Sequence, residues 1–213
     1  MSFIGVDVGT SATKVVLLTA DGEIAAKATT EYPRVSPRPM WSEQDPEDWW
    51  DGVCQGIRKV LRESGLPAAD VAGLSFSGQM VGLVVLDEQG RVIRPCILWN
   101  DQRSAEVTAR FTELVGLTTI LRETSNPLFA NFVAPKLVWM RENEPENYAR
   151  IRHVLMPKDY IIYRMTGRIV TEVSDASGTC LFNVRQRKWS ERMIEALGIS
   201  QEWSPDCVES EDA

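Results

Sequence analysis

Histidine and cysteine are scarce in this sequence of 213 residues. His153 is its one histidine, and its four cysteines lie far apart and form no C-x-x-C pair: Cys54, Cys96, Cys180 and Cys207. A structural zinc site or a disulfide framework is therefore not expected. A chain of this length, with 44% apolar residues, can bury a substantial core without either.

The sequence also lacks an excess of basic residues and any long apolar run. It has 23 lysines and arginines against 30 acidic residues, a formal charge of −7. This balance argues against nucleic acid or an anionic membrane surface as a partner, because both select a basic face. The segment Met1–Asp7 has no basic residue and reaches an acid too early for a secretory signal. We expect a cytoplasmic protein that binds neither nucleic acid nor membrane.

Three β-rich segments open the chain: 3–8, 13–19 and 23–32. Turn residues separate them at Gly9–Ser11 and at Asp21–Gly22, and this pattern predicts consecutive hairpins. Three prolines within residues 33–39 then predict a surface loop, since proline fits neither a helix interior nor a strand ladder.

The first predicted helix has clear signals at both ends. Asp45 is a suitable N-cap, Pro46 fits the first helical position, and Glu47 and Asp48 suit the positive first turn. Gly65 should end it. Further strands are predicted at 71–77, 83–86 and 92–98.

The second half of the chain is predicted to be mainly helical. A helix over 104–115 should end at Gly116, and two more should begin near Pro135 and Pro157, each proline in the first helical position. Gly167 should close the last of these. The remaining predictions are a β-pair over 169–182 and a short helix over 190–197 that ends at Gly198.

The turn after the first strand carries the clearest chemistry. Asp7 ends a buried strand, Gly9 allows close approach of the backbone to a ligand, Thr10 and Ser11 supply hydroxyls, and Lys14 follows on the return strand. These groups suit a phosphoryl group and its Mg²⁺. The sequence has neither a Walker P-loop nor a G-x-G-x-x-G fingerprint. A tight hairpin without a ligand is the alternative explanation.

The predicted order of strands and helices, with this acidic glycine turn, resembles the ribonuclease H-like α/β domain of actin, hexokinase and sugar kinases, a mixed central sheet flanked by helices. Within that superfamily the sequence resembles the FGGY carbohydrate kinases, and among them the xylulokinases most. The segments that carry the resemblance keep a shared order: Ile4–Ser11 with Lys14; Trp41–Pro46 with Trp49–Trp50; Gly78–Met80; Arg94–Pro95; Leu98–Asp101 with Arg103; Ala134–Leu137; Leu155–Tyr160; and Ser174–Thr179.

This resemblance implies ATP-dependent phosphorylation of a sugar or polyol that lies in a cleft between two domains. By the same resemblance, Asp7 helps to place Mg²⁺ and the transferred phosphate. The cofactor-binding turn would comprise Gly9, Thr10, Ser11, Thr13 and Lys14. Residues 1–213 would be the amino-terminal sugar-binding domain, and the base aspartate and adenine pocket would belong to a carboxy-terminal domain absent from this chain. The fragment alone is then expected to have little or no turnover.

The sugar site implied by the resemblance contains Gln79, Met80, Val81, Trp99 and Asp101. Asp101 and Gln79 could exchange hydrogen bonds with vicinal hydroxyls, and Trp99 offers a flat face to the apolar side of a sugar. Arg103 is expected to orient Asp101 through an ion pair. Members of this family are often dimers, so a homodimer is a further expectation.

One departure from the family concerns the substrate. Xylulokinases usually have histidine where this sequence has Val81, which cannot hydrogen-bond a sugar hydroxyl. A ketopentose such as xylulose is favoured as substrate, and ribulose, glycerol or a hexulose stay open, as does a non-catalytic sugar-binding module. An actin-like assembly protein is disfavoured by the segment Trp99–Asp101. A nuclease is disfavoured because Asp7 is the one acid placed on a central strand.

Overall fold

The structure is a computed structural model, which describes residues 1–212. The chain divides into two compact units, each described by itself below. The first unit comprises Met1–Arg34 and Asp45–Gln79, and the second comprises Val35–Gln44 and the chain from Met80 onward. Among residues 1–212, no helix combines the length and the apolar character needed to cross a membrane.

The first unit is a mixed four-stranded sheet in the order β3-β2-β1-β5. Its strands are β1 (Ser2–Val8), β2 (Ala12–Thr19), β3 (Ile24–Glu31) and β5 (Val71–Gly78). β1 pairs antiparallel with β2 and parallel with β5. A short 3₁₀ turn, Ala68–Asp70, precedes β5. The three predicted opening strands and the predicted strand over 71–77 are therefore confirmed.

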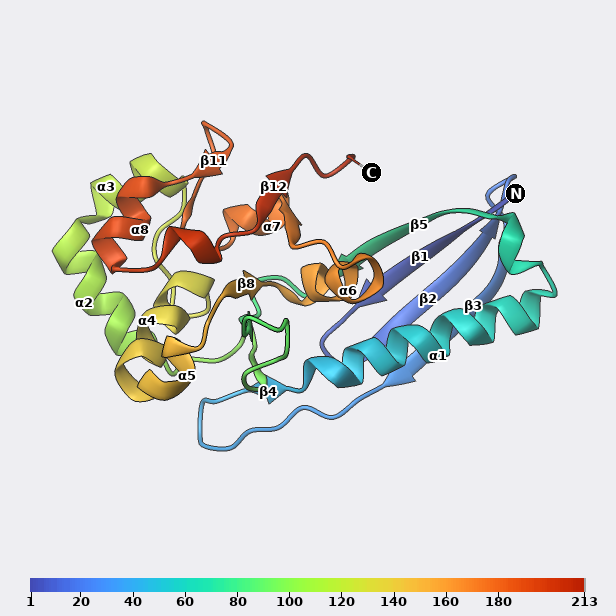
Figure 1. Cartoon of the computed structure of the whole chain (residues 1–213), viewed down its shortest axis with the longest axis horizontal. Helices are drawn as coiled ribbons and strands as arrows, with labels where there is room; N and C mark the ends of the chain where they lie inside the picture. Colours follow the sequence, from blue (N-terminus) through green and yellow to red (C-terminus); the bar gives the residue numbers. More distant parts are fainter. Residues whose placement is uncertain (213) are drawn as a thin grey trace. The chain divides into compact units, whose positions relative to one another are not determined.

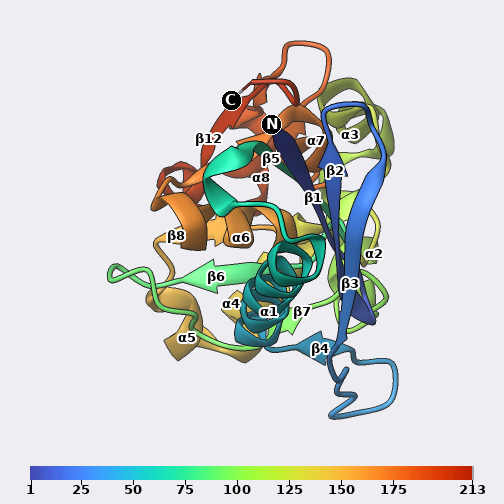
Figure 2. The ribbon, with the colours of Figure 1, turned by 90° about the vertical axis from the view of Figure 1, so that its right-hand side faces the viewer.

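Helix α1 (Pro46–Ser64) lies along β2 and β3 of this sheet (Figures 1 and 2). The side chain of Asp45 accepts a hydrogen bond from Glu47 N at 3.0 Å, and Gly65 ends the helix at φ 68°, so both predicted ends are confirmed. Gly56 permits close packing, because a Cβ there would lie 2.5 Å from Val15 Cγ2. The helix thus covers the face of the sheet on which Val15 lies.

Among its described residues, 35–44 and 80–212, the second unit contains four two-stranded pairings. Antiparallel pairs join β4 (Glu43–Gln44) to β7 (Cys96–Ile97), β6 (Val84–Leu86) to β8 (His153–Leu155), and β10 (Phe182–Asn183) to β11 (Lys188–Trp189). A parallel pair joins β9 (Val170–Glu172) to β12 (Asp206–Val208). The predicted strand over 92–98 is wrong in length, since regular pairing covers only β7.

The second unit also contains helices, several of which contribute residues to its hydrophobic core (Figure 1). They are α2 (Ala105–Val115), α3 (Leu117–Thr124), α4 (Val133–Asn143), α5 (Pro145–Ala149), α6 (Pro157–Thr166), α7 (Val173–Ser177) and α8 (Glu191–Leu197), with a 3₁₀ turn at Gln201–Trp203. Residues 133–140 of α4 are all buried. Helix α4 is therefore the central helix of this core.

Several local predictions for the second unit need correction. Residues 169–182 do not form a β-pair: the Glu172 carboxylate accepts hydrogen bonds from Ser174 N and Asp175 N, both at 2.8 Å, and so begins α7. Pro135 occupies the third helical position, since α4 begins at Val133, whereas Pro157 does begin α6. The helices α3 and α5 were not predicted.

Candidate functional site

The predicted phosphate-binding turn lies between β1 and β2 of the first unit. Gly9 N donates to Ala12 O at 3.1 Å, and a Cβ on Gly9 would lie 3.0 Å from that same oxygen. The register pairs Asp7 with Lys14, so the two lie opposite each other on one face of the sheet. The Asp7 carboxylate and the Lys14 ammonium thus flank the turn on the same face of the sheet.

Thr13 lies on the other face. It is buried, and a Cβ built on Gly52 of α1 would lie 3.2 Å from Thr13 Oγ1. Successive side chains of a strand point to opposite faces, so Thr13 cannot share a face with Lys14. The assignment of Thr13 to the phosphate-binding set therefore does not fit this arrangement, and Thr13 belongs to the interface with α1.

Two side chains hold the turn through the carbonyl of Gly9. Tyr32 Oη donates to Gly9 O at 2.5 Å and Gln79 Nε2 donates to it at 3.4 Å. Burial raises the pKa of Tyr32 to about 12, so its hydroxyl keeps the donated proton. Gln79, predicted to bind sugar, is thus placed beside the turn. Tyr32 was not singled out from the sequence, because an aromatic residue at a strand end carries no specific signal.

The other predicted sugar-site residues belong to the second unit and differ in exposure. Met80 and Trp99 are 47% and 43% exposed, so part of each apolar side chain is accessible. Val81 is buried and adopts a left-handed backbone at φ 53°. Leu83 pairs antiparallel with Ile97, which brings the segments that carry Val81 and Trp99 alongside each other.

Asp101 is fully buried, and its carboxylate is already satisfied by the protein. Oδ2 accepts from Ser42 N at 2.6 Å and from Arg103 Nη2 at 2.7 Å, while Oδ1 accepts from Arg103 N and Nε at 2.8 and 2.9 Å. The predicted Arg103–Asp101 ion pair is therefore present. The direct hydrogen bonds predicted from Asp101 to sugar hydroxyls do not fit, because neither oxygen is exposed.

Arg103 is the centre of a buried ionic network. Its side chain is fully buried between the rings of Trp41 and Trp139, with Cζ 3.8 and 5.0 Å from their centroids. Its Nη1 lies 2.7 Å from Glu43 Oε1, and Glu43 also pairs with Arg94. This network ties the segment just after Trp99 to β4. The side chain of Arg103 thus holds Asp101 and Glu43 and has no exposed atom to offer a ligand.

A second buried ionic cluster surrounds Lys158. Its Nζ lies 2.7 Å from Asp159 Oδ1, 3.2 Å from Asp175 Oδ2 and 3.7 Å from Glu172 Oε1. Burial opposes the charge of Lys158, but the carboxylates of Asp159 and Asp175 outweigh it and raise the lysine's pKa. Burial, and then the charge of Asp159, raise the pKa of Asp175 to about 7.

Replacing Asp175 should flatten the pH dependence of stability. Because its pKa in the folded protein lies above the ordinary 3.8, the folded state binds more protons, and the free energy of unfolding falls as pH rises from about 4 to about 7. In Asp175→Asn, we expect this fall to shrink by about 1–3 kcal/mol. Urea unfolding at several pH values measures it. A variant whose stability falls as steeply as that of the unmodified chain would contradict the assignment.

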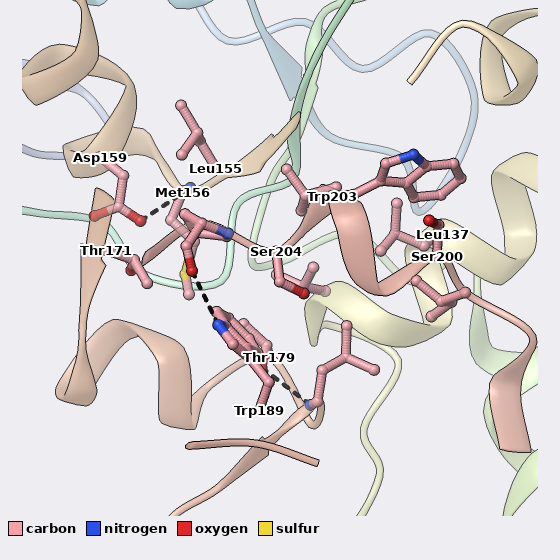
Figure 3. A pocket seen from close by; sticks show the side chains of 15 residues that line it. Leu137, Leu155, Met156, Asp159, Thr171, Thr179, Trp189, Ser200, Trp203 and Ser204 are labelled. Carbon is pink, nitrogen blue, oxygen red and sulfur yellow. Dashed lines mark hydrogen bonds between the residues drawn. The ribbon is translucent and has the colours of Figure 1, made fainter. Parts of the chain in front are cut away.

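A cavity of about 20 Å³ lies in the second unit beside this cluster (Figure 3). Asp159 and Thr171 line one side, and Leu137 and Trp203 line another (Figure 3). Ligand pockets usually have about 300–1,000 Å³, whereas one water needs about 10–15 Å³. The cavity is therefore a place for a single water and not for a sugar.

The donor set for Mg²⁺ is small. Among residues 1–212 there is no group of three or more His, Cys, Asp or Glu side chains that could hold a metal. Asp7 is the carboxylate at the turn, and Mg²⁺ bound with a nucleotide commonly takes only one or two carboxylates, completing its shell with water and phosphate oxygens. The turn thus fits Mg²⁺ that arrives with ATP phosphates.

Lys136 is the main residue of the second unit that sequence reasoning left without a role. It is fully buried in α4, and its Nζ donates to Val81 O at 2.7 Å and to Ile97 O at 3.1 Å. A lone lysine within the otherwise apolar helical segment 133–140 is a signal that could have drawn attention to it.

Comparison with known proteins gives one consistent result. Residues 2–213 match the model of the FGGY family of carbohydrate kinases, N-terminal domain. A xylulose kinase of Bacillus subtilis is 41% identical over 209 residues, which are 98% of this chain and 42% of the relative. A xylulose kinase of Escherichia coli is 40% identical over 210 residues, 99% of this chain and 43% of the relative.

Solved structures agree with this result. A protein described as a xyloylose kinase from Brucella ovis superposes with a TM-score of 0.93 at 37% identity, over 98% of this chain and 43% of that protein. A gluconate kinase from Lactobacillus acidophilus has a TM-score of 0.91 at 28% identity, over 97% of this chain and 42% of that protein. The predicted sugar-kinase fold is confirmed. The chain spans about two fifths of the length of these relatives.

Proposed function

Because the chain belongs to the FGGY family of carbohydrate kinases, we propose that the protein containing it transfers the γ-phosphoryl group of ATP to a hydroxyl of a sugar, and that this chain supplies the sugar-binding half. The observation that carries the proposal is the match to xylulose kinases across 98–99% of the chain. The base would come from the part of the family's length that this chain does not cover. A cytoplasmic location, where ATP is available, and a homodimer belong to the same proposal.

In this proposal the Gly9 turn of the first unit holds the transferred phosphate. Gly9 gives close access to the backbone, Thr10 and Ser11 supply hydroxyls, and Lys14 supplies a positive charge on the same face as Asp7. Bound Mg²⁺ would neutralise charge on the phosphate oxygens. Asp7 would hold that ion directly or through water, and Tyr32 and Gln79 would keep the turn in shape through Gly9 O.

In the second unit, Met80 and Trp99 are the side chains proposed to contact the sugar. Both are large, apolar and exposed, and an indole face packs well against the C–H side of a sugar ring or chain. Val81 would contribute mainly through its turn, since its side chain is buried. Asp101 and Arg103 would act indirectly, by fixing the segment that follows Trp99.

A ketopentose, with D-xylulose first, is the substrate class that the relatives favour. The valine at position 81 offers no side-chain hydrogen bond, so selectivity for one hydroxyl arrangement over another should be set by other contacts. Ribulose, glycerol, hexuloses and a sugar acid such as gluconate are the alternatives to include in any screen.

The test is a coupled ADP-release assay on a hybrid kinase, defined as residues 1–213 joined to the part of the Bacillus subtilis xylulose kinase that follows its matched segment. The panel contains ketopentoses, hexuloses, glycerol and gluconate. We expect at least one sugar to stimulate ADP release. Sugar binding by calorimetry without ADP release, in a hybrid that still binds ATP, would instead favour a non-catalytic sugar-binding module.

Replacing Trp99 should weaken sugar binding with little effect on the chemical step. In the hybrid kinase, Trp99→Ala is expected to raise the sugar KM by about 10–100-fold, since it removes a stacking face, and to change the KM for ATP by less than about twofold. Phe129→Ala is the matched control, because Phe129 is also a half-exposed aromatic residue of the second unit. Equal sugar KM values in the two variants would remove Trp99 from the proposed site.

A further inference from the structure

Lys136 lies where packing alone would favour an apolar side chain. It is fully buried in α4, among neighbours that are themselves buried. Burial lowers the pKa of Lys136 to about 7; the groups that act on it electrostatically are Cys96, Asp101 and Arg103. A buried amine is costly unless it makes good hydrogen bonds. The contribution of Lys136 to the structure should therefore come from its hydrogen bonds to two backbone carbonyls.

Those two carbonyls belong to the segments that carry the proposed sugar contacts. Lys136 Nζ lies 2.7 Å from the carbonyl oxygen of Val81, the residue that follows Met80. It lies 3.1 Å from the carbonyl oxygen of Ile97, which is two residues before Trp99. The two segments already pair through Leu83 and Ile97. Lys136 thus ties them together a second time, at the end that carries Met80 and Trp99.

The backbone of Val81 is the part that most needs such support. A left-handed conformation is unfavourable for a β-branched residue, and Val81 has φ 53°. Its N–H donates to Met156 Sδ at 3.2 Å, and its carbonyl accepts from Lys136. The side chain of Val81 packs close to Gly178: a Cβ built on Gly178 would lie 2.7 Å from Val81 Cγ1 and 3.5 Å from Met80 Cε. Three elements thus fix this turn.

We propose that Lys136 is a positioning residue that holds the left-handed turn at Val81 and thereby fixes Met80 and Trp99 for the sugar. The effect on sugar affinity rests on the proposed function, whereas the effect on the turn does not. The two parts can therefore be tested separately, the first by kinetics on the hybrid kinase and the second by NMR on the 213-residue chain itself.

The kinetic arm uses Lys136→Met, which keeps the length of the side chain and removes the donor. We expect the sugar KM of the hybrid kinase to rise by about 10-fold or more, because small displacements of positioning groups are costly, while the KM for ATP and kcat change by less than about threefold. The control is Val138→Ala. Val138 is also fully buried in α4 but is about 200° away around the helix from position 136.

The structural arm follows the methyl signals of Val81 in the chain labelled at valine methyls. The unmodified chain should show one sharp pair with cross-peaks to the Gly178 Hα protons. In Lys136→Met, these signals should broaden or split, and the cross-peaks should weaken. Gly178→Ala should disturb the same signals from the opposite side and also raise the sugar KM. Cooperative thermal unfolding confirms that each variant is folded.

The outcomes separate the two parts of the inference. A raised sugar KM together with altered Val81 signals supports it. An unchanged sugar KM in a folded Lys136→Met hybrid, or a rise equal to that in Val138→Ala, overturns the role of Lys136 in sugar binding. If the unmodified hybrid uses no sugar, the proposed function fails. The Val81 methyl signals of the Lys136→Met chain then test the turn-holding role by themselves: unchanged signals overturn this role, and altered signals support it.

Discussion

Asp7→Asn is expected to reduce sugar-dependent ADP release by the hybrid kinase by about 10²–10⁴-fold while leaving the fold intact. The amide has nearly the same shape as the carboxylate but has no charge with which to hold Mg²⁺ at the phosphate. Asp7 is only partly buried, and its cross-strand neighbour Lys14 is exposed, so removing the charge should change the free energy of unfolding by less than about 1 kcal/mol.

The control for this variant is Asp21→Asn. Asp21 is an exposed acid in the turn between β2 and β3, at the other end of the hairpin strand from Lys14. The substitution Asp21→Asn removes one negative charge from the same sheet, as Asp7→Asn does, but leaves the Gly9 turn unchanged. The assignment of Asp7 to phosphoryl transfer fails if Asp7→Asn retains the activity of this control.

Arg103→Met is expected to destabilise the 213-residue chain by about 3–5 kcal/mol, the largest stability effect we predict. The substitution fills much of the space between Trp41 and Trp139 but leaves the fully buried Asp101 carboxylate without its ion-pair partner, and Glu43 keeps only Arg94. A buried charge that has lost its ion pair retains the cost of desolvation. Urea unfolding at pH 7, with the slope compared between variants, gives the change in the free energy of unfolding.

The matched control is Arg110→Met, which removes the same charged group from an exposed ion pair. Arg110 and Glu142 are 54% and 37% exposed, so this change should cost less than about 1 kcal/mol. Similar losses in the two variants would show that the Arg103 network does not have the structural role assigned to it.

The elements that sequence predicted well are those whose signals are local. Helix α1 is one example: Asp45 as N-cap, Pro46 as first residue and Gly65 as terminator all act within a few residues of the helix ends. The opening strands are another, since alternation and the Gly9 turn define them without reference to the rest of the chain.

The errors arise where a contact between distant residues decides the outcome. Residues 173–177 form a helix because Glu172 caps it, and Glu172 is in turn held by β12 from the end of the chain. The missed helix α3 has a local cause instead: Gly116 ends α2 as predicted, but its carbonyl accepts from Thr119 N and Ile120 N, so α3 begins at the next residue.

The site shows the same division. Asp7, Gly9 and Lys14 could be grouped by sequence, because one hairpin brings them together. The burial of Asp101 could not be predicted, since it depends on Ser42, 59 residues away. The role proposed for Lys136 likewise depends on contacts with Val81 and Ile97, 55 and 39 residues away. A charged residue in an apolar segment indicates that such partners exist but not which residues they are.

The central claim is that this chain is the sugar-binding half of a carbohydrate kinase, and the rate of ADP release by the hybrid kinase, with and without D-xylulose, tests it most directly. The account predicts that this sugar, or another in the panel, raises the rate by at least about 10-fold above the sugar-free rate. The same rate with and without every sugar, from a hybrid that unfolds cooperatively and binds ATP, would contradict it.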